Sequence, residues 1–153
     1  MRLSQVIFST YLIVLLLAFY IWIWSPRVQA AERWIVIGNH NVQLNANRQQ
    51  LIRIFMMQRL VDDQGQPLRL YSFVPEDERF LAFVSQCLRW PPQVIARRWR
   101  RNLTTGEGTT PYFVDTESQM EEKVSKQAGG LGYLLAEQLS GDANYRVIYQ
   151  CKE

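Results

Sequence analysis

The longest hydrophobic stretch of the chain lies near its N-terminus. Residues 6–24 read VIFSTYLIVLLLAFYIWIW, in which only Ser9 and Thr10 are polar. Because no polar face interrupts this run, it does not have the pattern of a helix that packs on a globular core. Its length is close to what is needed to cross the hydrocarbon core of a bilayer. We therefore separate residues 1–30 from residues 31–153 and interpret them as a signal peptide or an N-terminal membrane anchor.

The residues that flank this run favour export. Arg2 precedes it, and the sequence Val28-Gln29-Ala30 follows it with small side chains at the two positions that signal peptidase reads. The single flanking charge places the N-terminus on the cytoplasmic side. Both interpretations predict that residues 31–153 lie in the periplasm. The domain would be soluble after signal cleavage, or anchored in the inner membrane by residues 6–24.

From residue 33 onwards, short runs rich in β-branched residues alternate with helical patterns. The runs predict strands at 33–38, 68–74, 131–134 and 145–150. Helical spacing and capping residues predict helices at 47–58, 77–89, 92–101 and 117–127. This alternation is typical of the α/β class, and we expect a mixed sheet flanked by helices.

Two of the predicted helices have a clear buried face. In the helix at 77–89 the apolar residues recur at helical spacing, and they are Phe80, Phe83, Val84, Cys87 and Leu88. In the helix at 92–101 we expect the inward side chains to be Val94, Ile95 and Trp99. The helices at 47–58 and 117–127 begin after good capping residues, Asn47 and Thr116, each with a glutamine three positions later.

Composition and charge exclude several classes of function. The 17 basic and 14 acidic residues include Arg2 and Arg27, so the rest of the chain is almost neutral and nucleic acid is not an expected partner. One histidine and two cysteines cannot form a paired-histidine or four-cysteine metal site, and we expect neither a metal nor a cofactor. No nucleophile elbow or phosphate-binding loop motif is present, so the sequence predicts no enzyme.

The two cysteines have two interpretations. In an oxidising compartment, Cys87 and Cys151 could form a disulfide that stabilises the fold. Alternatively both remain unpaired, and Cys87 is one more buried residue of its helix stripe. Sequence alone does not fix the distance between their Cα atoms, so both interpretations stay open.

Four segments follow one another in an order that carries a resemblance. They are LIRIFMMQ at 51–58 with D-x-G-Q-P at 63–67, the helix with Phe80 and Phe83, the tryptophan-bearing helix leading to TGEGTTP at 105–111, and AGGLGY at 128–133. Together they resemble the small, single-lobe members of the type 2 periplasmic-binding-protein superfamily. These proteins are usually described as phosphate ABC-transporter substrate-binding-like. The resemblance spans residues 33–150 and implies a single binding-protein lobe.

One segment departs from that family. Phosphate-binding members hold the anion at a helix N-terminus with a segment rich in serine, glycine and threonine. The matching stretch here, 72–79, has no glycine and carries three successive carboxylates at Glu76, Asp77 and Glu78. Acidic residues suit the first turn of a helix, but they would repel a phosphate bound there. We interpret this stretch as a well-capped helix start.

Two groups of residues are candidates for recognition. Backbone amides and hydroxyls that could bind a small anion belong to Ser72, Thr104, Thr105, Gly106, Gly108, Thr109 and Thr110. The alternative for this loop is an ordinary connection that uses glycine for its backbone freedom. A patch that could bind a partner is formed by Arg97, Arg98, Arg100 and Arg101, although a solvated helix face has the same composition.

These observations lead to two hypotheses for function. The first is an exported, non-enzymatic, binding-protein-like module that acts through contacts with an unidentified envelope protein. The alternative is binding of a small, phosphate-like anion associated with ABC transport. A single lobe supplies half of a cleft, so the alternative requires a second wall from another subunit.

Overall fold

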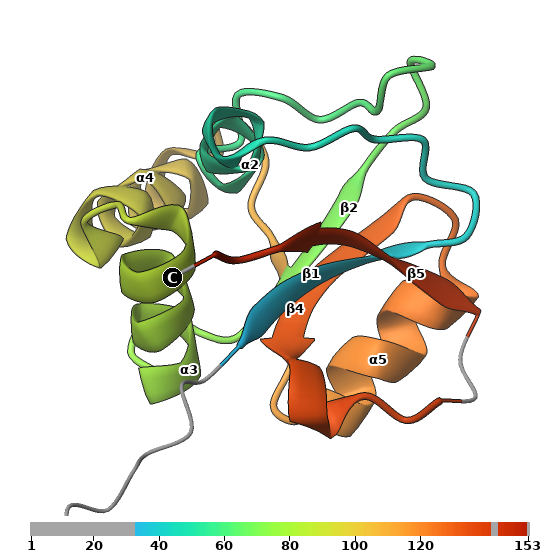
Figure 1. Ribbon diagram of the computed structural model, residues 1–153. Coiled ribbons are helices and arrows are strands. Elements are labelled where there is room, and N and C mark those ends of the chain that lie inside the picture. The colour runs from blue at the N-terminus through green and yellow to red at the C-terminus, as the bar shows by residue number, and fades with distance from the viewer. Residues whose placement is uncertain (1–32, 142–143, 153) are drawn as a thin grey trace, which may run out of the picture. The chain divides into compact units, whose positions relative to one another are not determined.

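The computed structural model describes residues 33–141 and 144–152, which belong to one compact unit, Glu32–Glu153 (Figure 1). The N-terminal segment that we interpret as a signal peptide or anchor lies outside the described residues. Within the described ranges, no helix combines the length and the apolar character that crossing a membrane requires.

A five-stranded mixed sheet forms the centre of the domain (Figure 1). Its strands are β1 (Trp34–Asn39), β2 (Arg69–Ser72), β3 (Tyr112–Phe113), β4 (Gly130–Leu135) and β5 (Tyr145–Gln150), in the spatial order β3-β2-β4-β1-β5. β2 runs parallel to β3 and β4, whereas β1 runs antiparallel to β4 and β5. The predicted α/β class with a mixed sheet is confirmed. The two-residue β3 was not predicted, because it is too short to show alternation.

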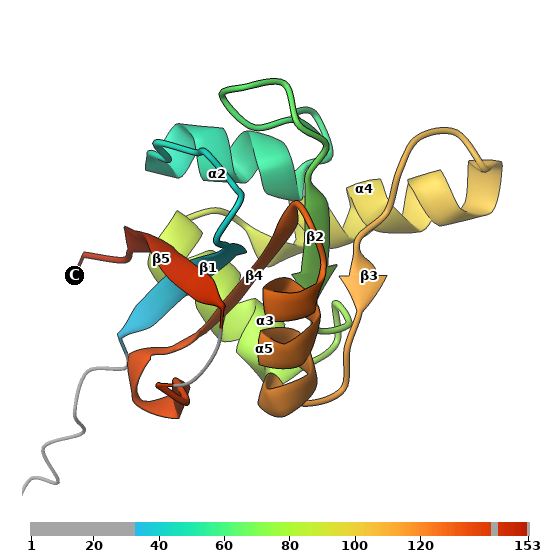
Figure 2. The same ribbon diagram turned by 90° about the vertical axis from the view of Figure 1, so that its right-hand side faces the viewer.

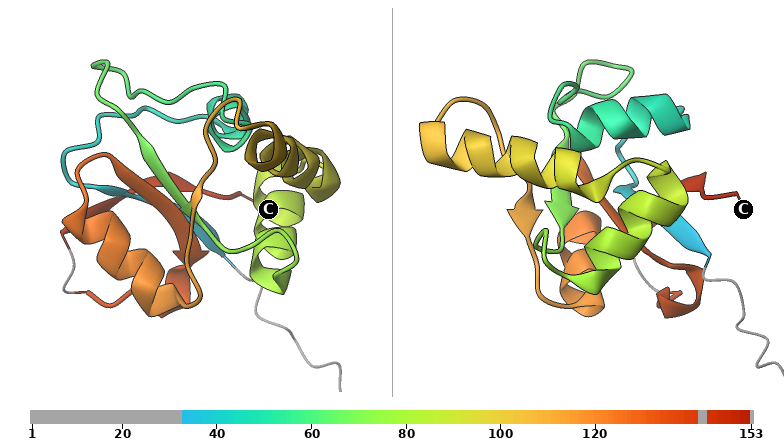
Figure 3. Two further views of the ribbon diagram at one scale, coloured as in Figure 1. Left: turned by 180° about the vertical axis from the view of Figure 1, so that it is seen from behind. Right: turned by 90° about the vertical axis from the view of Figure 1, so that its left-hand side faces the viewer.

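Helices cover both faces of the sheet (Figures 2 and 3). They are α2 (Arg48–Phe55), α3 (Glu78–Ala82), the π-helix η1 (Phe83–Leu88), α4 (Pro92–Thr105), α5 (Glu117–Lys126) and the 3-10 helix η2 (Ala136–Gln138). α5 packs on one face, and α2, α3, η1 and α4 gather on the other (Figure 3). Gly132 of β4 permits the close approach of α5, because a Cβ there would lie 2.5 Å from the sulfur of Met120.

Tyr133 lies at the centre of the core on the opposite face of β4. Its ring stacks on Phe83 at 3.9 Å and contacts Phe55 at 5.7 Å, so it joins the sheet to η1 and α2. Its hydroxyl lies 3.0 Å from Ser72 Oγ and accepts a hydrogen bond from the Phe73 amide. Burial raises the pKa of Tyr133 far above its ordinary value, so the phenol stays protonated in this network.

The predicted buried stripe at 77–89 is confirmed, but the helix that carries it is not uniform. Phe80, Phe83, Val84, Cys87 and Leu88 are all buried. The chain begins as α-helix at Glu78 and continues as π-helix from Phe83, with a wider turn that period-3.6 spacing does not reveal. The helix ends at Arg89, which adopts a left-handed conformation with φ 51°.

α4 is longer than predicted, and its buried face differs from the predicted one by one residue. It continues to Thr105 rather than ending near residue 101, and Gly106 terminates it with φ 68°. The inward residues are Ile95, Trp99 and Asn102, each one turn after the last. Val94 falls beside this row and is 38% exposed, so its predicted inward position is wrong.

The capping predictions are confirmed for two helices. Asn47 and Gln50 form a reciprocal capping box at the start of α2, and the Thr116 hydroxyl accepts a hydrogen bond from the Gln119 amide at the start of α5. These bonds satisfy backbone amides that the first helical turn leaves without an intrahelical partner.

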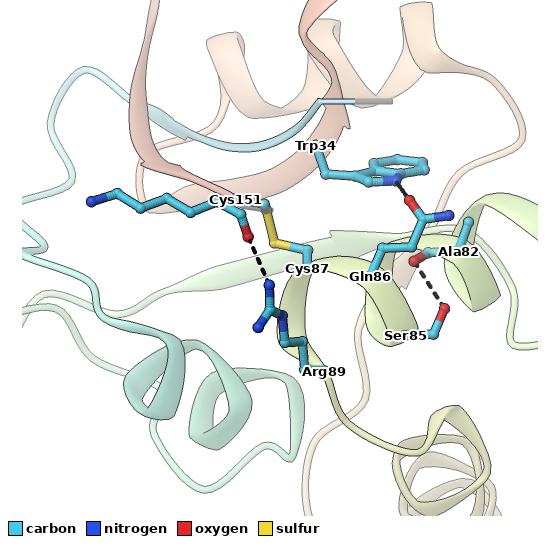
Figure 4. Close-up of a disulfide and its surroundings, with 8 residues drawn as sticks. Trp34, Ala82, Ser85, Gln86, Cys87, Arg89 and Cys151 are labelled. Atoms are coloured by element: carbon cyan, nitrogen blue, oxygen red, sulfur yellow. Dashed lines mark hydrogen bonds between the residues drawn. A yellow bond between two sulfur atoms is a disulfide. The ribbon is translucent and has the colours of Figure 1, made fainter. Parts of the chain in front are cut away.

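The structure resolves the alternatives for the cysteines in favour of a disulfide (Figure 4). Cys87 of η1 and Cys151, directly after β5, are bonded with their Cα atoms 5.1 Å apart. Beside the disulfide, Trp34 Nε1 donates to Gln86 Oε1 at 2.9 Å (Figure 4). The cross-link therefore ties the last strand to the helical layer.

Candidate functional site

The carboxyl ends of the parallel strands β2 and β3 meet at one edge of the sheet (Figure 2). The segments that follow them lead to the N-terminal ends of α3 and α5 at the same edge. Ligands of open α/β sheets usually bind at such an edge. It is also the place of the segment 72–79, where the resemblance puts the anion-binding residues.

Arg79 of α3 organises this edge. Its guanidinium binds both carboxylate oxygens of Asp77, at 2.8 and 2.6 Å, and pairs with Glu117 at 2.9 Å. It also donates to the carbonyl of Asp115 at 3.0 Å and lies 3.7 Å from the centre of the Phe73 ring. We call Phe73, Asp77, Arg79, Asp115 and Glu117 the Arg79 cluster.

The contacts within the Arg79 cluster shift the pKa values of Asp77, Glu117 and Arg79 so that each group keeps its charge. The side-chain hydrogen bond from Arg79 is the main cause that lowers the pKa of Asp77, and burial opposes it. For Glu117, burial acts to raise the pKa, but hydrogen bonds led by the one from Arg79 outweigh it, so the pKa lies below its ordinary value. The same bonds raise the pKa of Arg79. All three groups are therefore charged at neutral pH, and two carboxylates share one guanidinium.

The Arg79 cluster lies at the N-terminal ends of α3 and α5. Asp77 caps α3 by accepting a hydrogen bond from the Arg79 amide at 2.9 Å, and Glu117 lies in the first turn of α5. Both helix N-termini are thus already next to carboxylates of the chain itself, where the helix dipole favours negative charge. Glu76 and Glu78 are exposed at the same edge and add negative charge. Carboxylates of the chain itself therefore stand at both helix N-termini, where an added anion would meet negative charge.

Ser72, a candidate anion ligand, lies in the core. Its side chain is fully buried, and its hydroxyl donates to the Phe73 carbonyl at 2.8 Å and lies within hydrogen-bond distance of Tyr133. The hydroxyl therefore fixes the end of β2 against β4 and does not face solvent.

The other candidate anion ligands follow α4. The hydroxyls of Thr104 and Thr105 donate to carbonyls of the preceding turn, and the Gly106 amide donates to Asn102. The Thr109 carbonyl accepts a hydrogen bond from the Asn102 side chain at 2.8 Å. Gly108 and Thr110 belong to the same connection, and Glu107 places a carboxylate in its middle. The structure thus puts these residues at a helix C-terminus, where the dipole is unfavourable to anions, and does not bring them together with Ser72.

The four candidate patch residues lie on α4, which contains no acidic residue. Arg97, Arg100 and Arg101 are exposed, and Arg98 is half-buried. The only ion pair that the described part of the chain gives them joins Arg100 to Glu76 at 3.8 Å, with both side chains at least 70% exposed. The C-terminal part of α4 extends past the edge strand β3 (Figure 2).

A hollow of about 290 Å³ lies between this helix and the start of α3. We call it the α3–α4 groove, and its lining consists of Pro75, Glu76, Leu81, Pro92, Gln93, Ala96, Arg97 and Arg100. Sequence reasoning found the two arginines but missed the apolar lining, because Pro75 and Leu81 belong to a different segment. The Arg79 cluster was also missed, since nothing in the sequence places Glu117 beside Arg79.

Two segments that carry the resemblance lie side by side in the fold. The carbonyl of Gly129 accepts a hydrogen bond from the Arg69 amide, and a Cβ on Gly129 would collide with the carbonyl of Pro67. Gly129 also has φ 75°, which favours glycine. The turn at 63–67 and the segment at 128–133 are therefore fitted to each other.

The turn at 63–67 is itself held by a buried carboxylate. Asp62 accepts hydrogen bonds from the backbone amides of Gln43, Gln64 and Gln66, each at 2.9 Å. Burial raises its pKa, but these bonds outweigh that effect and keep the pKa below its ordinary value. Asp62 is therefore a structural anchor.

Two further observations bear on function. Within residues 33–141 and 144–152, no three His, Cys, Asp or Glu side chains come together in a way that could hold a metal ion. Comparison of the chain with models of protein families finds no match, and neither does comparison with curated proteins.

Proposed function

We propose that this protein is an exported, non-enzymatic, binding-protein-like module that acts through protein–protein contacts in the cell envelope. The observation that carries the proposal is the Arg79 cluster. The edge at which a lobe of this kind would hold an anion is filled by the Asp77 and Glu117 carboxylates around Arg79. The scaffold is retained, whereas the chemistry for binding phosphate is replaced.

The lobe assignment rests on the order of the matching segments and on their packing. The mixed sheet agrees with it, and so does the contact of Gly129 with Pro67. Export is supported by the Cys87–Cys151 disulfide, since such bonds persist in oxidising compartments. We place the domain in the periplasm, either free after signal cleavage or held in the inner membrane by residues 6–24.

A role in protein contacts is supported by the surface of α4. Arg97, Arg100 and Arg101 are exposed, with a single ion pair at 3.8 Å among the described residues, and a groove of mixed polar and apolar lining runs beside Arg97 and Arg100.

The first test is thermal unfolding of the exported protein with millimolar phosphate or sulfate, against chloride of equal ionic strength. We expect no selective rise in Tm. A ligand at 100 times its Kd would add about 2.7 kcal/mol to the free energy of unfolding, which corresponds to several degrees in a domain of this size. A selective rise with phosphate would contradict the proposal and favour anion binding associated with ABC transport.

The same test has a second readout, which is cross-linking in intact cells. We expect a discrete cross-linked envelope protein with the natural chain, and its loss when Arg97, Arg98, Arg100 and Arg101 are all changed to Glu. If no cross-linked partner forms with the natural chain, a role in protein contacts is contradicted.

A further inference from the structure

We infer that the α3–α4 groove binds an acidic segment of a partner protein, with one apolar side chain in the groove and carboxylates on Arg97 and Arg100. This inference rests on the proposed function and specifies its partner surface. It is carried by three features of the groove, which are its apolar lining, the arrangement of its charges and the geometry of α4.

The apolar lining comes from two segments that converge. Pro75 and Leu81 contribute from the α3 side, and Pro92 and Ala96 contribute from α4. Leu81 is 39% exposed, although its neighbour Phe80 on the same helix is fully buried. Covering this lining with an aliphatic or aromatic side chain would remove apolar area from water and so favour binding.

The guanidinium groups of Arg97 and Arg100 can form further ion pairs. Arg97 and Arg100 are one helical turn apart, so their side chains project from the same side of α4. Among the described residues Arg97 has no ion pair, and Arg100 reaches only Glu76 at 3.8 Å, in solvent. Glu76 also lines the groove, so its lining carries two arginines against one carboxylate. The exposed pair of Arg100 with Glu76 contributes little, and a carboxylate of a partner can replace Glu76 on Arg100 with bidentate hydrogen bonds.

The combination favours a peptide over other anions. A small inorganic anion gains nothing from the apolar lining, and tight binding needs many converging donors in a site that excludes water. Nucleic acid usually stacks bases on aromatic side chains, and the groove lining contains none. An anionic membrane surface would engage all four arginines of α4, including Arg101, which does not line the groove. Dependence on Arg97 and Arg100 alone therefore distinguishes a peptide from a membrane.

The test uses the protein expressed from its complete sequence and purified in its exported form. The probe is a library of fluorescent seven-residue peptides with two Asp or Glu on each side of one varied position. We expect selection of Leu, Ile, Met or Phe at that position, and no binding of peptides in which Lys replaces the acidic residues. Equal retention of the acidic and Lys-containing peptides would overturn the inference.

Matched variants locate the site. The double change Arg97→Glu with Arg100→Glu should weaken binding of the selected peptide at least about tenfold, because two attractive contacts become repulsive. Arg101→Glu, which introduces a reversed charge on the same helix outside the groove, should change the affinity by less than about threefold. Equal losses for both variants would overturn the placement in the groove.

A second pair of variants tests the apolar lining. Leu81→Asp should abolish the preference for an apolar residue, whereas Leu103→Asp, at a leucine of α4 that is 61% exposed and outside the groove, should preserve it. Circular dichroism in the near ultraviolet verifies that both variants keep the native packing. Unchanged selectivity in a folded Leu81→Asp protein would overturn the inference.

The remaining arms separate this inference from the proposed function. Binding to phosphatidylglycerol vesicles with equal dependence on Arg97 and Arg101, without peptide binding, would overturn the peptide assignment in favour of a membrane surface. Absence of peptide binding while the in-cell cross-link persists would overturn the groove but leave the proposed function intact. A selective rise in Tm with phosphate would contradict the proposed function itself.

Discussion

The Arg79 cluster and the α3–α4 groove both place arginine beside carboxylate, yet they differ in how far those charges are satisfied. In the cluster, a partly buried guanidinium contacts two carboxylates, a backbone carbonyl and an aromatic ring. In the groove, Arg100 reaches one carboxylate at 3.8 Å, with both side chains mostly in solvent. The segment from Pro75 to Leu81 contributes to both regions.

This difference separates charges that hold the fold from charges that are available for recognition. A guanidinium has five N–H donors, and in the cluster most of them have acceptors within the chain. In the groove most donors face water, and the exchange of water for a partner costs the fold little. Residue type alone therefore does not identify the recognition surface. What identifies it is how many of the arginine N–H donors lack an acceptor within the chain.

The largest effect is expected at the disulfide, which holds η1 and hence the α3 segment that both regions share. Changing Cys87 and Cys151 together to Ala should lower the free energy of unfolding by about 2–4 kcal/mol, because the cross-link restricts the unfolded chain. Denaturant titration of the oxidised natural protein and the variant measures the difference. Reducing the natural protein should lower its stability in the same direction, and a loss below about 0.5 kcal/mol would contradict a structural role.

An intermediate effect is expected at the Arg79 cluster. The change Arg79→Gln removes the charged hydrogen bonds to Asp77 and Glu117, and it should lower the free energy of unfolding at pH 7 by about 1–2 kcal/mol. Denaturant titration measures this difference. A change in the free energy of unfolding near zero would show that the Arg79 cluster contributes as little as an exposed ion pair. The cluster and the α3–α4 groove would then not differ in this respect.

The pH dependence sharpens this second comparison. The pKa of Asp77 is lowered in the folded protein, chiefly by its hydrogen bond from Arg79. Its contribution to stability is therefore fully present above its unfolded pKa of about 3.9, and it is lost as the pH falls through the folded value. The destabilisation by Arg79→Gln should accordingly shrink on acidification below about pH 4, and equal destabilisation at neutral and acid pH would contradict the ion-pair account.

Sequence reasoning succeeded where the signal is local. Strands, helix starts and the buried stripe from Phe80 to Leu88 depend on neighbouring residues, and the structure confirms them. It was wrong where tertiary contacts decide. α4 continues to Thr105 because Asn102 is buried and its side chain bonds to Thr109, a contact that helix propensity does not contain.

The candidate site shows the same limit more strongly. The sequence identified the arginines of α4 and the acidic start of α3, because each is a cluster along the chain. It did not reveal that Arg79 reaches Glu117, 38 positions later, or that Ser72 is buried under Tyr133. Such contacts depend on the pairing of β2 with β3 and β4. These strands are too short for their own sequences to determine that pairing, and it follows from the packing of the whole domain.

The smallest effect is expected at the groove, where the same substitution is applied to exposed arginines. Changing Arg97 and Arg100 together to Gln should alter the free energy of unfolding by less than about 0.5 kcal/mol, because solvent already satisfies both guanidiniums. Nor should it change the dependence of stability on pH, since it leaves Asp77 and its bond to Arg79 in place. Denaturant titration at pH 7 and pH 4, alongside Arg79→Gln, provides the comparison. A loss as large as that of Arg79→Gln would show that Arg97 and Arg100 stabilise the fold. Their exposure to solvent would then no longer support a role in recognition.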